Sequence, residues 1–458
     1  MAFIAPLRGV RFNTAKAGRL DDIVTPPYDV IKEQSVEAFL AKNPYSMVRL
    51  DITKTPGAGA VDRERYVAAA NLFNQWREEG ILIRDQEDAL YLYETRYTLH
   101  SGKQLVRRGL LCLVGLAEFS EGVVKPHEHT FDTVVADRLQ LIQHCRAQFS
   151  QIFSLYSDPD NAVISLLESA RSEPAGSVTD ADGCVHSIRR VTDPAVIRQV
   201  QLFFRDQSLY IADGHHRYTT ALGYRRHLCQ QQGELPATHP ANHIMMYLCP
   251  MEDPGLSVLP THRLLYWPGR LNVDELTRRL RPGFDLDEIH AGSRESLVEE
   301  VLSRMDEIEQ RTREKTSTSF GVYHPGEDRC FVMTMKAGMN DHFEIDSPCL
   351  KDLDVVVLSE LIIKQYFGLD HQRCEHENLI HFYSDPDEAL DAAVKDSADR
   401  DDITPLLFLM NPTRVEQVKK VADANQVMPH KSTYFYPKIM TGLLFYQLVD
   451  NEVINRLE

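Results

Sequence analysis

The chain has 458 residues, and 43% of them are hydrophobic, which is enough apolar material for about two or three domains. The formal net charge of −17 excludes a general binder of nucleic acid or anionic membranes, because both need a basic surface. A small basic pocket for a phosphorylated ligand is compatible with that charge. The eight cysteines form no CxxC pair and have no regular spacing, which indicates reduced thiols.

The sequence also argues against export and membrane insertion. The N-terminal segment MAFIAPLRGVRF lacks the long apolar stretch of a signal peptide. No apolar run approaches the roughly 20 residues that a membrane span needs. We therefore expect a cytoplasmic protein with a small-molecule substrate and no nucleic-acid or membrane partner, and a homo-oligomer is compatible with the sequence.

The first predicted elements mix helices with antiparallel strands. Residues 25–30 and 43–50 each predict a loop followed by a strand, since an X-Pro bond favours extended backbone. Residues 61–79 predict an amphipathic helix, because apolar side chains recur at helical spacing and Gly80 follows as a C-cap. Residues 89–99 and 109–119 predict the two strands of a hairpin.

The later elements complete the prediction of the fold. In chain order we expect a strand or turn at 148–156, a helix from the turn at 214 to about 229, a strand at 243–251, helices at 272–280 and 293–311, strands at 318–323 and 329–336, a helix at 354–367, a strand at 405–410 and a helix at 415–425. Hairpins beside helices indicate an α+β fold, with mixed sheets and flanking helices. The turn Asp253-Pro254-Gly255 suggests a boundary, which predicts an N-terminal domain of residues 1–252 and a second α+β domain of residues 253–458.

Residues 211–220, IADGHHRYTT, hold the densest group of functional side chains. An apolar run ends at Asp213-Gly214 and a helix-like segment follows, which predicts a strand, a tight turn and a helix start. Such a turn directs main-chain N–H groups and the positive end of the helix dipole at a ligand, which favours an anion. Arg217 can bind a phosphate or carboxylate bidentately, with His215 and His216 beside it. The alternative is a solvated helix N-terminus with incidental polar residues.

A second polar group is His127-Glu128-His129-Thr130, followed by Asp137-Arg138. Histidines at i and i+2 lie on one side of an extended segment, so they could ligate a metal together with His215 or His216. Alternatively, Glu128 is a general base that takes a proton from a substrate hydroxyl. The third interpretation is a loop whose histidines only form local hydrogen bonds.

Three further segments are weaker candidates. The segment 431–438, KSTYFYPK, has Lys431 and Lys438 at its ends, and these lysines, with the hydroxyls of Ser432 and Thr433, could contact phosphate. A strand with a solvated lysine face explains the same residues equally well. The turn 260–263, PTHR, is more typical of a structural role, and residues 374–377 predict a surface turn.

Taken in order, six motifs carry a resemblance. They are PPYDVI from Pro26, NPYSMVRL from Asn43, HEHT from His127 with DR at Asp137, IADGHHRYTTAL from Ile211, PTHR from Pro260 and MPHKSTYFYPK from Met428. Together they resemble a large, mostly uncharacterised family of bacteria and archaea that is described as a domain of unknown function. The Asp-Gly-His-His-Arg turn is also similar to the phosphate-binding turn of the ParB and sulfiredoxin superfamily, which includes free-serine kinases.

The resemblance implies a ParB/sulfiredoxin-like phosphate-binding core and narrows the expected function. It implies a small-molecule phosphotransferase, with free L-serine as the best guess for the acceptor and pyrophosphate, ADP or ATP as donor with Mg²⁺. Histidine stands where sulfiredoxin has its cysteine, so sulfinic-acid reduction is not expected. No Walker A or kinase glycine loop is present.

In this interpretation the site residues have separate roles. Glu128, Asp213 and His216 are the catalytic candidates, and the phosphate or substrate contacts come from His127, Arg138, Gly214, His215, Arg217, Lys431, Ser432 and Thr433. No protein-held metal is assigned. Two alternatives remain: a nucleotide-sensing regulator that binds without turnover, and a metal-dependent phosphoester hydrolase built on the histidines.

Overall fold

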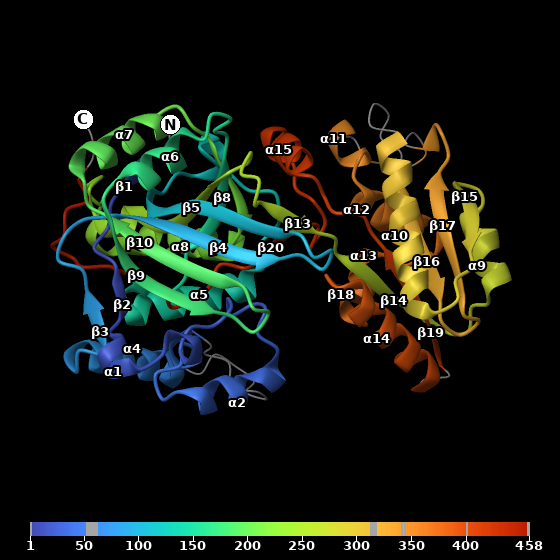
Figure 1. The fold of residues 1–458 in the computed structure, drawn as a ribbon, viewed down its shortest axis with the longest axis horizontal. Coiled ribbons are helices and arrows are strands. Elements are labelled where there is room, and N and C mark those ends of the chain that lie inside the picture. The colour runs from blue at the N-terminus through green and yellow to red at the C-terminus, as the bar shows by residue number, and fades with distance from the viewer. Residues whose placement is uncertain are drawn as a thin grey trace. The chain divides into compact units, whose positions relative to one another are not determined.

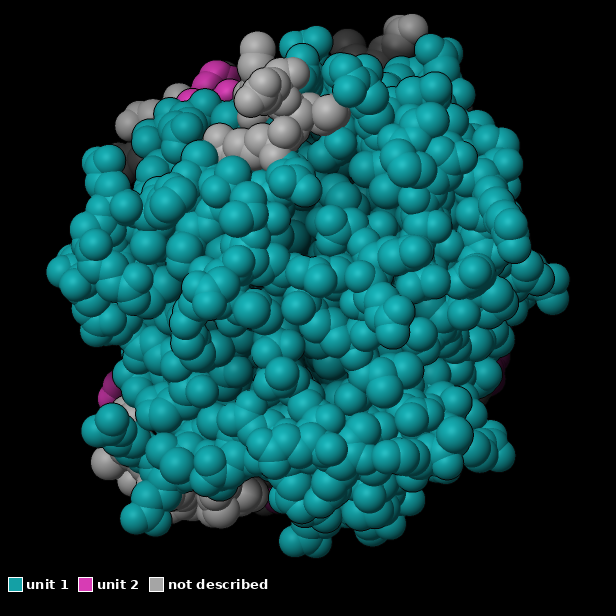
Figure 2. Space-filling view, turned by 90° about the vertical axis from the view of Figure 1, so that its left-hand side faces the viewer, with its two compact units in different colours: residues 1–257, 435–458 teal, residues 258–434 magenta. Residues whose placement is uncertain are grey.

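A computed structural model describes residues 2–51, 63–311, 318–339, 342, 345, 347–399 and 402–455. The chain forms two compact units, the first of residues 1–257 and 435–458 and the second of residues 258–434. Each unit combines helices with a sheet, so the predicted α+β class is confirmed (Figure 1). Residues 1–257 and 435–458 form one continuous surface in Figure 2.

Within the described residues, the main sheet of the first unit has nine strands. Eight of them run in the order β6-β11-β8-β12-β5-β4-β10-β9, and β1 pairs with β5. The strands are β1 (Ile4–Ala5), β4 (Leu90–Thr98), β5 (Gln104–Gly115), β6 (Val124–Lys125), β8 (Ile152–Tyr156), β9 (Ser172–Thr179), β10 (Val185–Val191), β11 (Leu209–Asp213) and β12 (His243–Pro250). Every side chain of β12 is buried, as expected for a central strand covered on both faces.

The helices of the first unit cover this sheet. They are α1 (Thr14–Ala17), α2 (Glu33–Lys42), α3 (Val48–Asp51), α4 (Arg63–Glu78), α5 (Asp132–Cys145), α6 (Ala162–Ser169), α7 (Pro194–Phe204) and α8 (His215–Gln232), with 3-10 turns η1 (Leu20–Asp22), η2 (Phe119–Glu121) and η3 (Pro240–Asn242). α6 and α7 lie above the sheet in Figure 1, and α4 and α5 lie below it. Asp193 caps α7 through two main-chain N–H groups, and Pro194 occupies its first turn, which fixes where this helix begins.

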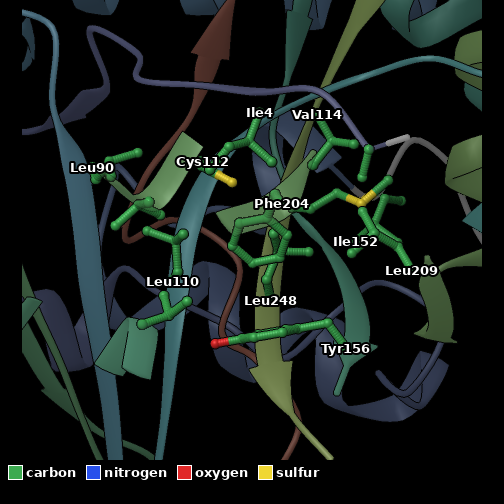
Figure 3. Packing of buried hydrophobic residues seen from close by; sticks show 14 of the residues in the cluster. Ile4, Leu90, Leu110, Cys112, Val114, Ile152, Tyr156, Phe204, Leu209 and Leu248 are labelled. Atoms are coloured by element: carbon green, nitrogen blue, oxygen red, sulfur yellow. The ribbon is translucent and has the colours of Figure 1, made fainter. Parts of the chain in front are cut away.

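Among the described residues of the first unit, two hydrophobic clusters stand out. One lies between the main sheet and α6 and α7, where the ring centroids of Tyr156 and Phe204 are 4.7 Å apart beside Leu248 (Figure 3). The other lies under α4, whose Tyr66, Phe73 and Trp76 are fully buried. Each large apolar side chain buried in this way stabilises the fold by about 1.5–3 kcal/mol.

Short strand pairs bring distant parts of the first unit together. β2 (Val10–Phe12) pairs with β3 (Leu82–Arg84), and β7 (Ala147–Gln148) pairs with β21 (Tyr446–Gln447). The second of these pairs ties the C-terminal segment to the first unit. The short strands β13 (Ser257–Leu259) and β20 (Tyr434–Tyr436) lie where the chain passes from one unit to the other.

The second unit is built on a sheet of six strands in the order β15-β17-β16-β19-β14-β18, counted over the described residues. Its elements are β14 (His262–Pro268), α9 (Val273–Leu280), β15 (Phe284–Ile289), α10 (Arg294–Arg311), β16 (Ser319–His324), β17 (Arg329–Met335), α11 (Pro348–Lys351), α12 (Asp354–Val356), the π-helix η5 (Val357–Tyr366), α13 (His371–His376), β18 (Ile380–Tyr383), α14 (Pro386–Asp399), β19 (Ile403–Leu409) and α15 (Val415–Asp423). α10 and α14 pack against the sheet and share its core with β14, β16, β17 and β19.

The structure corrects several details of the predicted elements. Residues 48–51 form the helix α3 instead of the strand expected within 43–50, because the buried side chains are Met47, Val48, Leu50 and Asp51, whose spacing matches one face of a helix. Residues 371–376 form a helix whose Cys374 is buried, where a surface turn was expected. The predicted helix 61–79 begins at residue 63 in the described part of the chain, and residues 61–62 lie outside it.

The division of the chain also differs from the expected domains 1–252 and 253–458. Residues 435–458 belong to the first unit, although the sequence places them in the second half. The physical reason is pairing across the sequence: β21 lies against β7, and Glu452 binds the guanidinium groups of Arg8 and Arg84. In the described residues, no helix combines the length and apolar character that crossing a membrane requires.

Candidate functional site

The turn between β11 and α8 has the strand–glycine–helix geometry predicted for residues 211–220. β11 is buried along Leu209–Ala212 and ends at Asp213, and α8 begins at His215. Gly214 links them with φ 97° and ψ 27°, in the left-handed region that favours glycine. A Cβ atom at this position would lie 3.0 Å from the guanidinium of Arg217. Glycine therefore gives the backbone its sharp turn and leaves room for that arginine.

The N-terminus of α8 is open to an anionic partner. Gly214 provides no side-chain cap, and the first turn of the helix contains no acidic residue. The first main-chain N–H groups of a helix have no partner within it, and the helix dipole adds positive charge at the same end. These groups therefore favour an anion beside the turn.

Asp213 lies between two cations. Its Oδ2 accepts from Nη2 of Arg217 at 2.6 Å, and its Oδ1 accepts from Nζ of Lys438 at 3.1 Å. Arg217 also donates through Nη1 to the carbonyl of Gln151 at 2.5 Å. Burial by itself would raise the pKa of Asp213, but Lys438 and Arg217 outweigh it and hold the pKa below its ordinary value. This cluster, which we call the turn cluster (Asp213, Gly214, Arg217 and Lys438), contains one more cation than carboxylate.

The two histidines of the turn hold the loop that contains Glu128. Nε2 of His215 accepts from the main-chain N–H of His127 at 3.2 Å, and Nε2 of His216 accepts from that of Phe131 at 3.0 Å. The rings of His127 and His215 meet edge to face with centroids 4.7 Å apart. The sequence placed these segments in one site, and the structure brings them together.

These histidines are neutral near pH 7. Burial lowers the pKa of His127 to about 4, and burial also lowers the pKa values of His215 and His216. A neutral ring has one N–H and one acceptor nitrogen. Since Nε2 accepts in both His215 and His216, each ring has its proton on Nδ1, where it can be donated to a ligand or a carboxylate.

Glu128 lies beside the turn, with Oε2 3.9 Å from Nδ1 of His215. Its side chain is 20% exposed, so a substrate in solvent can reach it. A partly exposed carboxylate next to a neutral imidazole is suited to accept a proton from a hydroxyl group.

Arg138 lies deeper, in a charged network under the turn. Its guanidinium binds Asp51 at 3.1 Å and Asp137 at 2.7 Å, and it lies 4.2 Å from the ring centroid of Tyr28. Among the described residues, Oδ2 of Asp51 is buried without a hydrogen-bond partner, and burial raises the pKa of this carboxyl group. Both Arg138 and Arg217 line a cavity of about 50 Å³ whose wall also contains Asp51 and apolar side chains such as Leu141 and Phe149. Arg138 is therefore placed against the same cavity as the turn arginine.

The remaining predicted contacts, Lys431, Ser432 and Thr433, belong to the second unit. The hydroxyl of Ser432 donates to the carbonyl of Pro429, and its own carbonyl accepts from Thr413 at 2.7 Å. Nζ of Lys431 lies 5.6 Å from the ring centroid of Phe382. Their membership of the same site as the turn cluster stays a prediction.

Within the part of the chain that the structure describes, no three His, Cys, Asp or Glu side chains group so as to hold a metal. The Nε2 atoms of His215 and His216 are occupied by main-chain N–H groups. Both oxygens of Asp213 are occupied by cations. The arrangement is therefore better suited to hold an anion than a bare metal ion.

Sequence reasoning underestimated Lys438 and missed Gln151. Lys438 was only one of several polar residues in its segment, and its contact with Asp213 spans 225 residues of sequence. Gln151 binds Arg217 through its main-chain carbonyl, an atom that every residue type has. The KSTYFYPK motif was a usable signal for Lys438, whereas no signal in the sequence identified Gln151.

The fold and this geometry define an α+β protein with a glycine turn at the start of a helix, lined by cations and neutral histidines. A family model described as "Protein of unknown function (DUF1015)" matches residues 4–356, which is more than half of the chain. The protein belongs to this family. No curated protein matches it.

Solved structures show only distant similarity. A free serine kinase in complex with AMP has 13% sequence identity and a TM-score of 0.31, covering 70% of this chain and 89% of that chain. A conserved hypothetical protein from Pyrococcus furiosus has 13% identity and a TM-score of 0.29, covering 70% and 92%. SbnI with a C-terminal truncation, from Staphylococcus aureus, has 8% identity and a TM-score of 0.32, covering 72% and 85%. Values this low transfer neither fold nor activity to this chain.

Proposed function

We propose that this protein is a phosphotransferase that moves a phosphoryl group from pyrophosphate or a nucleotide to a small hydroxylated acceptor, with free L-serine as the first acceptor to test. The observation that carries the proposal is the turn cluster, where Arg217 and Lys438 meet one carboxylate beside the N-terminus of α8. A phosphate placed there gains two cations and the first main-chain N–H groups of α8, which have no partner within the helix.

The chemistry of phosphoryl transfer needs little more than such a site. The reaction depends on positioning of the donor and on neutralisation of charge on the transferred group, and preorganised donors supply both. In the proposal, Arg217, Lys438 and the amides of α8 bind the donor phosphates. The Nδ1–H groups of His215 and His216 provide further donors, with His216 at the more open position. Arg138, which is paired with Asp51 and Asp137, is a further proposed contact on the cavity wall.

Glu128 is the proposed general base. It takes the proton of the acceptor hydroxyl as the acceptor oxygen bonds to the terminal phosphorus. The bond between that phosphorus and its bridging oxygen breaks, and the shortened donor leaves with the electron pair. Glu128 is placed for this step by the main-chain bonds from His127 and Phe131 to the two turn histidines.

Mg²⁺ accompanies the donor in this proposal. Mg²⁺ in phosphoryl transfer commonly keeps several waters and binds one or two carboxylates together with the substrate phosphates. Asp213 does not fit the role of such a ligand in the arrangement described, because both of its oxygens bind cations. No step above depends on the metal.

The test is an assay for phosphoserine formed from serine with ATP, ADP or pyrophosphate and Mg²⁺. We expect turnover with at least one donor, and we expect Glu128→Gln to lower kcat by about 10²–10⁴-fold with little change in KM. Glu121→Gln, in the 3-10 turn η2, is the matched control and should keep full activity.

Other outcomes of the same assay separate the alternatives. No turnover with any donor or hydroxy amino acid would remove the proposal, and saturable nucleotide binding without turnover would support a nucleotide-sensing regulator. Stoichiometric zinc or manganese in the purified protein, lost in His127→Ala, would support a phosphoester hydrolase. Full activity of His216→Ala would contradict the catalytic role of that histidine.

A further inference from the structure

Arg107 is a buried arginine that the proposed mechanism does not use. It lies on β5, its side chain is fully buried, and its guanidinium carbon is 4.9 Å from the ring centroid of Phe153 and 5.7 Å from that of Tyr247. Burying a charged group is costly unless its hydrogen-bonding groups find partners. An apolar side chain of similar length would fill this space at lower cost, so the contacts of Arg107 need an explanation.

The hydrogen bonds of Arg107 go to two consecutive main-chain carbonyls. Nη1 donates to the carbonyl of Tyr436 at 2.9 Å, and Nη2 donates to that of Pro437 at 2.6 Å. The next residue is Lys438, whose ammonium group binds Asp213 in the turn cluster. The fork of the guanidinium therefore fixes the main chain immediately before the lysine.

The segment is also fixed just after Lys438. Nε2 of Gln151 donates to the carbonyl of Met440 at 3.1 Å, and the main-chain N–H of Met440 donates to the hydroxyl of Tyr93 at 3.3 Å. The carbonyl of Gln151 also accepts from Arg217. Gln151 therefore links Arg217 to the segment that carries Lys438. Lys438 thus projects from a short stretch of main chain that is fixed on both sides.

The sheet makes room for this arrangement. A Cβ atom at Gly109, two residues along β5, would lie 2.3 Å from the ring of Tyr247. Glycine at this position lets the Tyr247 ring lie close to β5, where it also flanks the guanidinium of Arg107.

We propose that Arg107 is a positioning residue: it fixes the main chain at Tyr436 and Pro437 so that the ammonium group of Lys438 is held in the turn cluster before an anion arrives. This preorganisation strengthens anion binding because the lysine loses less conformational freedom when the ligand binds. The inference deepens the proposed function and rests on it only in taking phosphate as the anion.

The experiment is a double-mutant cycle on pyrophosphate affinity, measured by calorimetry on the full chain without an acceptor. A hydrogen bond to a charged group contributes about 1.5–3 kcal/mol, so we expect Lys438→Met and Arg107→Met each to weaken binding about tenfold or more. In the Lys438→Met background, Arg107→Met should weaken binding less than about twofold, because its effect acts through the lysine. Arg107→Lys should restore part of the loss.

A matched control separates positioning from general damage. Arg225→Met removes a part-buried arginine that binds the carbonyl of Leu116 and the carboxylate of Glu118 elsewhere in the first unit, and it should leave affinity unchanged. Equal effects of Arg107→Met with and without Lys438 would overturn the proposal, as would unchanged affinity. If Arg107→Met fails to fold, the same double-mutant cycle can be measured with Arg107→Lys, for which we expect a smaller coupling to Lys438→Met.

A second measurement keeps the inference separate from the proposed function. The rate at which an amine-reactive reagent modifies Lys438, read by mass spectrometry, should rise about tenfold or more in Arg107→Met, because the freed lysine leaves Asp213. If the effects of Arg107→Met and Lys438→Met on pyrophosphate affinity are coupled but no donor is turned over, the inference about Arg107 holds and the proposed phosphotransferase activity is rejected. If the protein binds no pyrophosphate, an unchanged modification rate removes the inference and a raised rate supports it.

Discussion

The turn cluster of the first unit and the PTHR region of the second unit are both basic motifs, yet their cations have different partners. In the turn cluster, Arg217 and Lys438 share the carboxylate of Asp213, and Arg217 also has a main-chain partner, the carbonyl of Gln151. In the second unit, Arg263 donates to the main-chain carbonyls of Thr261 and Lys431 and lies 4.9 Å from the ring centroid of Phe382.

The partner decides what a basic residue can do. The side chain of a cation that is held by a carboxylate can turn toward an incoming phosphate. It then loses its contact with the carboxylate, and the phosphate replaces that contact. A cation held by main-chain carbonyls stabilises the fold of the loop, and moving it would leave buried carbonyls without donors. The contrast indicates ligand binding for the turn cluster and a supporting role for Arg263.

The largest expected effect tests this contrast directly. Arg217→Met should weaken pyrophosphate binding about a hundredfold, because it removes a bidentate donor and leaves Asp213 with Lys438 alone. Arg263→Met should change the affinity at most about fivefold while lowering the free energy of unfolding by about 2 kcal/mol. Calorimetric titration gives the pyrophosphate affinity of the two variants, and urea unfolding gives their stability. A larger loss of affinity in Arg263→Met than in Arg217→Met would contradict the comparison.

Acid should destabilise both units for the same reason. Burial lowers the pKa of His127 in the first unit and of His262 in the second to about 4, from an ordinary value of 6.5. Since the unfolded chain takes up these protons first, stability is full above pH 6.5 and falls as the pH drops toward 4. Each histidine should account for about 3 kcal/mol of that loss.

Urea unfolding between pH 4 and pH 8 measures this loss of stability. Where the two units unfold in separate transitions, each transition is followed by itself. His127→Gln should flatten the pH dependence of the first unit and His262→Gln that of the second. An unchanged slope in either variant would show that its histidine is not the titrating group.

The glycine of the turn should show a smaller effect. Gly214→Ala places a Cβ atom at φ 97° and 3.0 Å from the guanidinium of Arg217, so we expect a loss of about 1–2 kcal/mol in stability together with weaker anion binding. Gly233→Ala, at the other end of α8 with φ 85°, is the matched control, because a Cβ atom there would meet no other part of the described chain within 4 Å apart from its immediate neighbours. It should lose stability alone. Equal anion affinity in the two variants would argue against a role for Arg217.

The smallest expected effect concerns Lys431, which the sequence assigned to phosphate. Lys431→Met should weaken pyrophosphate binding about fivefold without lowering the melting temperature, because this side chain is exposed. Lys419→Met, an exposed lysine of α15 paired with Asp423 at 2.7 Å, controls for the loss of a surface charge. If Lys431→Met and Lys419→Met bind pyrophosphate with the same affinity, Lys431 has no role in binding phosphate.

Local patterns in the sequence predicted most elements of the fold. The helix α4 follows from the spacing of its apolar residues, and α8 follows from the glycine turn before it, because both signals lie within a few residues. The strand predicted within residues 43–50 was wrong, since a short buried segment has too few residues to separate helical from strand periodicity. The C-terminal segment was assigned to the second domain because chain order is a poor guide to long-range pairing.

The candidate site, like the fold, could be predicted only in part. The turn and the segment 127–130 were predicted to lie together, and the histidine–main-chain bonds show how they meet. The partners of Asp213 could not be predicted, because Lys438 is 225 residues away and only the folded sheet brings it near. Arg107 was not singled out, since its partners are main-chain atoms.

The return of residues 435–458 to the first unit has a consequence for how the protein is made. When the ribosome has synthesised the first 257 residues, every described strand of the main sheet and the whole glycine turn have been made, but Lys438 has not. Domains generally begin to fold during synthesis, from the N-terminus onward. The nascent first unit must therefore wait, with Asp213 lacking one of its two cations, while the ribosome adds the entire second unit. Anion binding at the turn should mature only when Lys438 has left the ribosome and can reach Asp213.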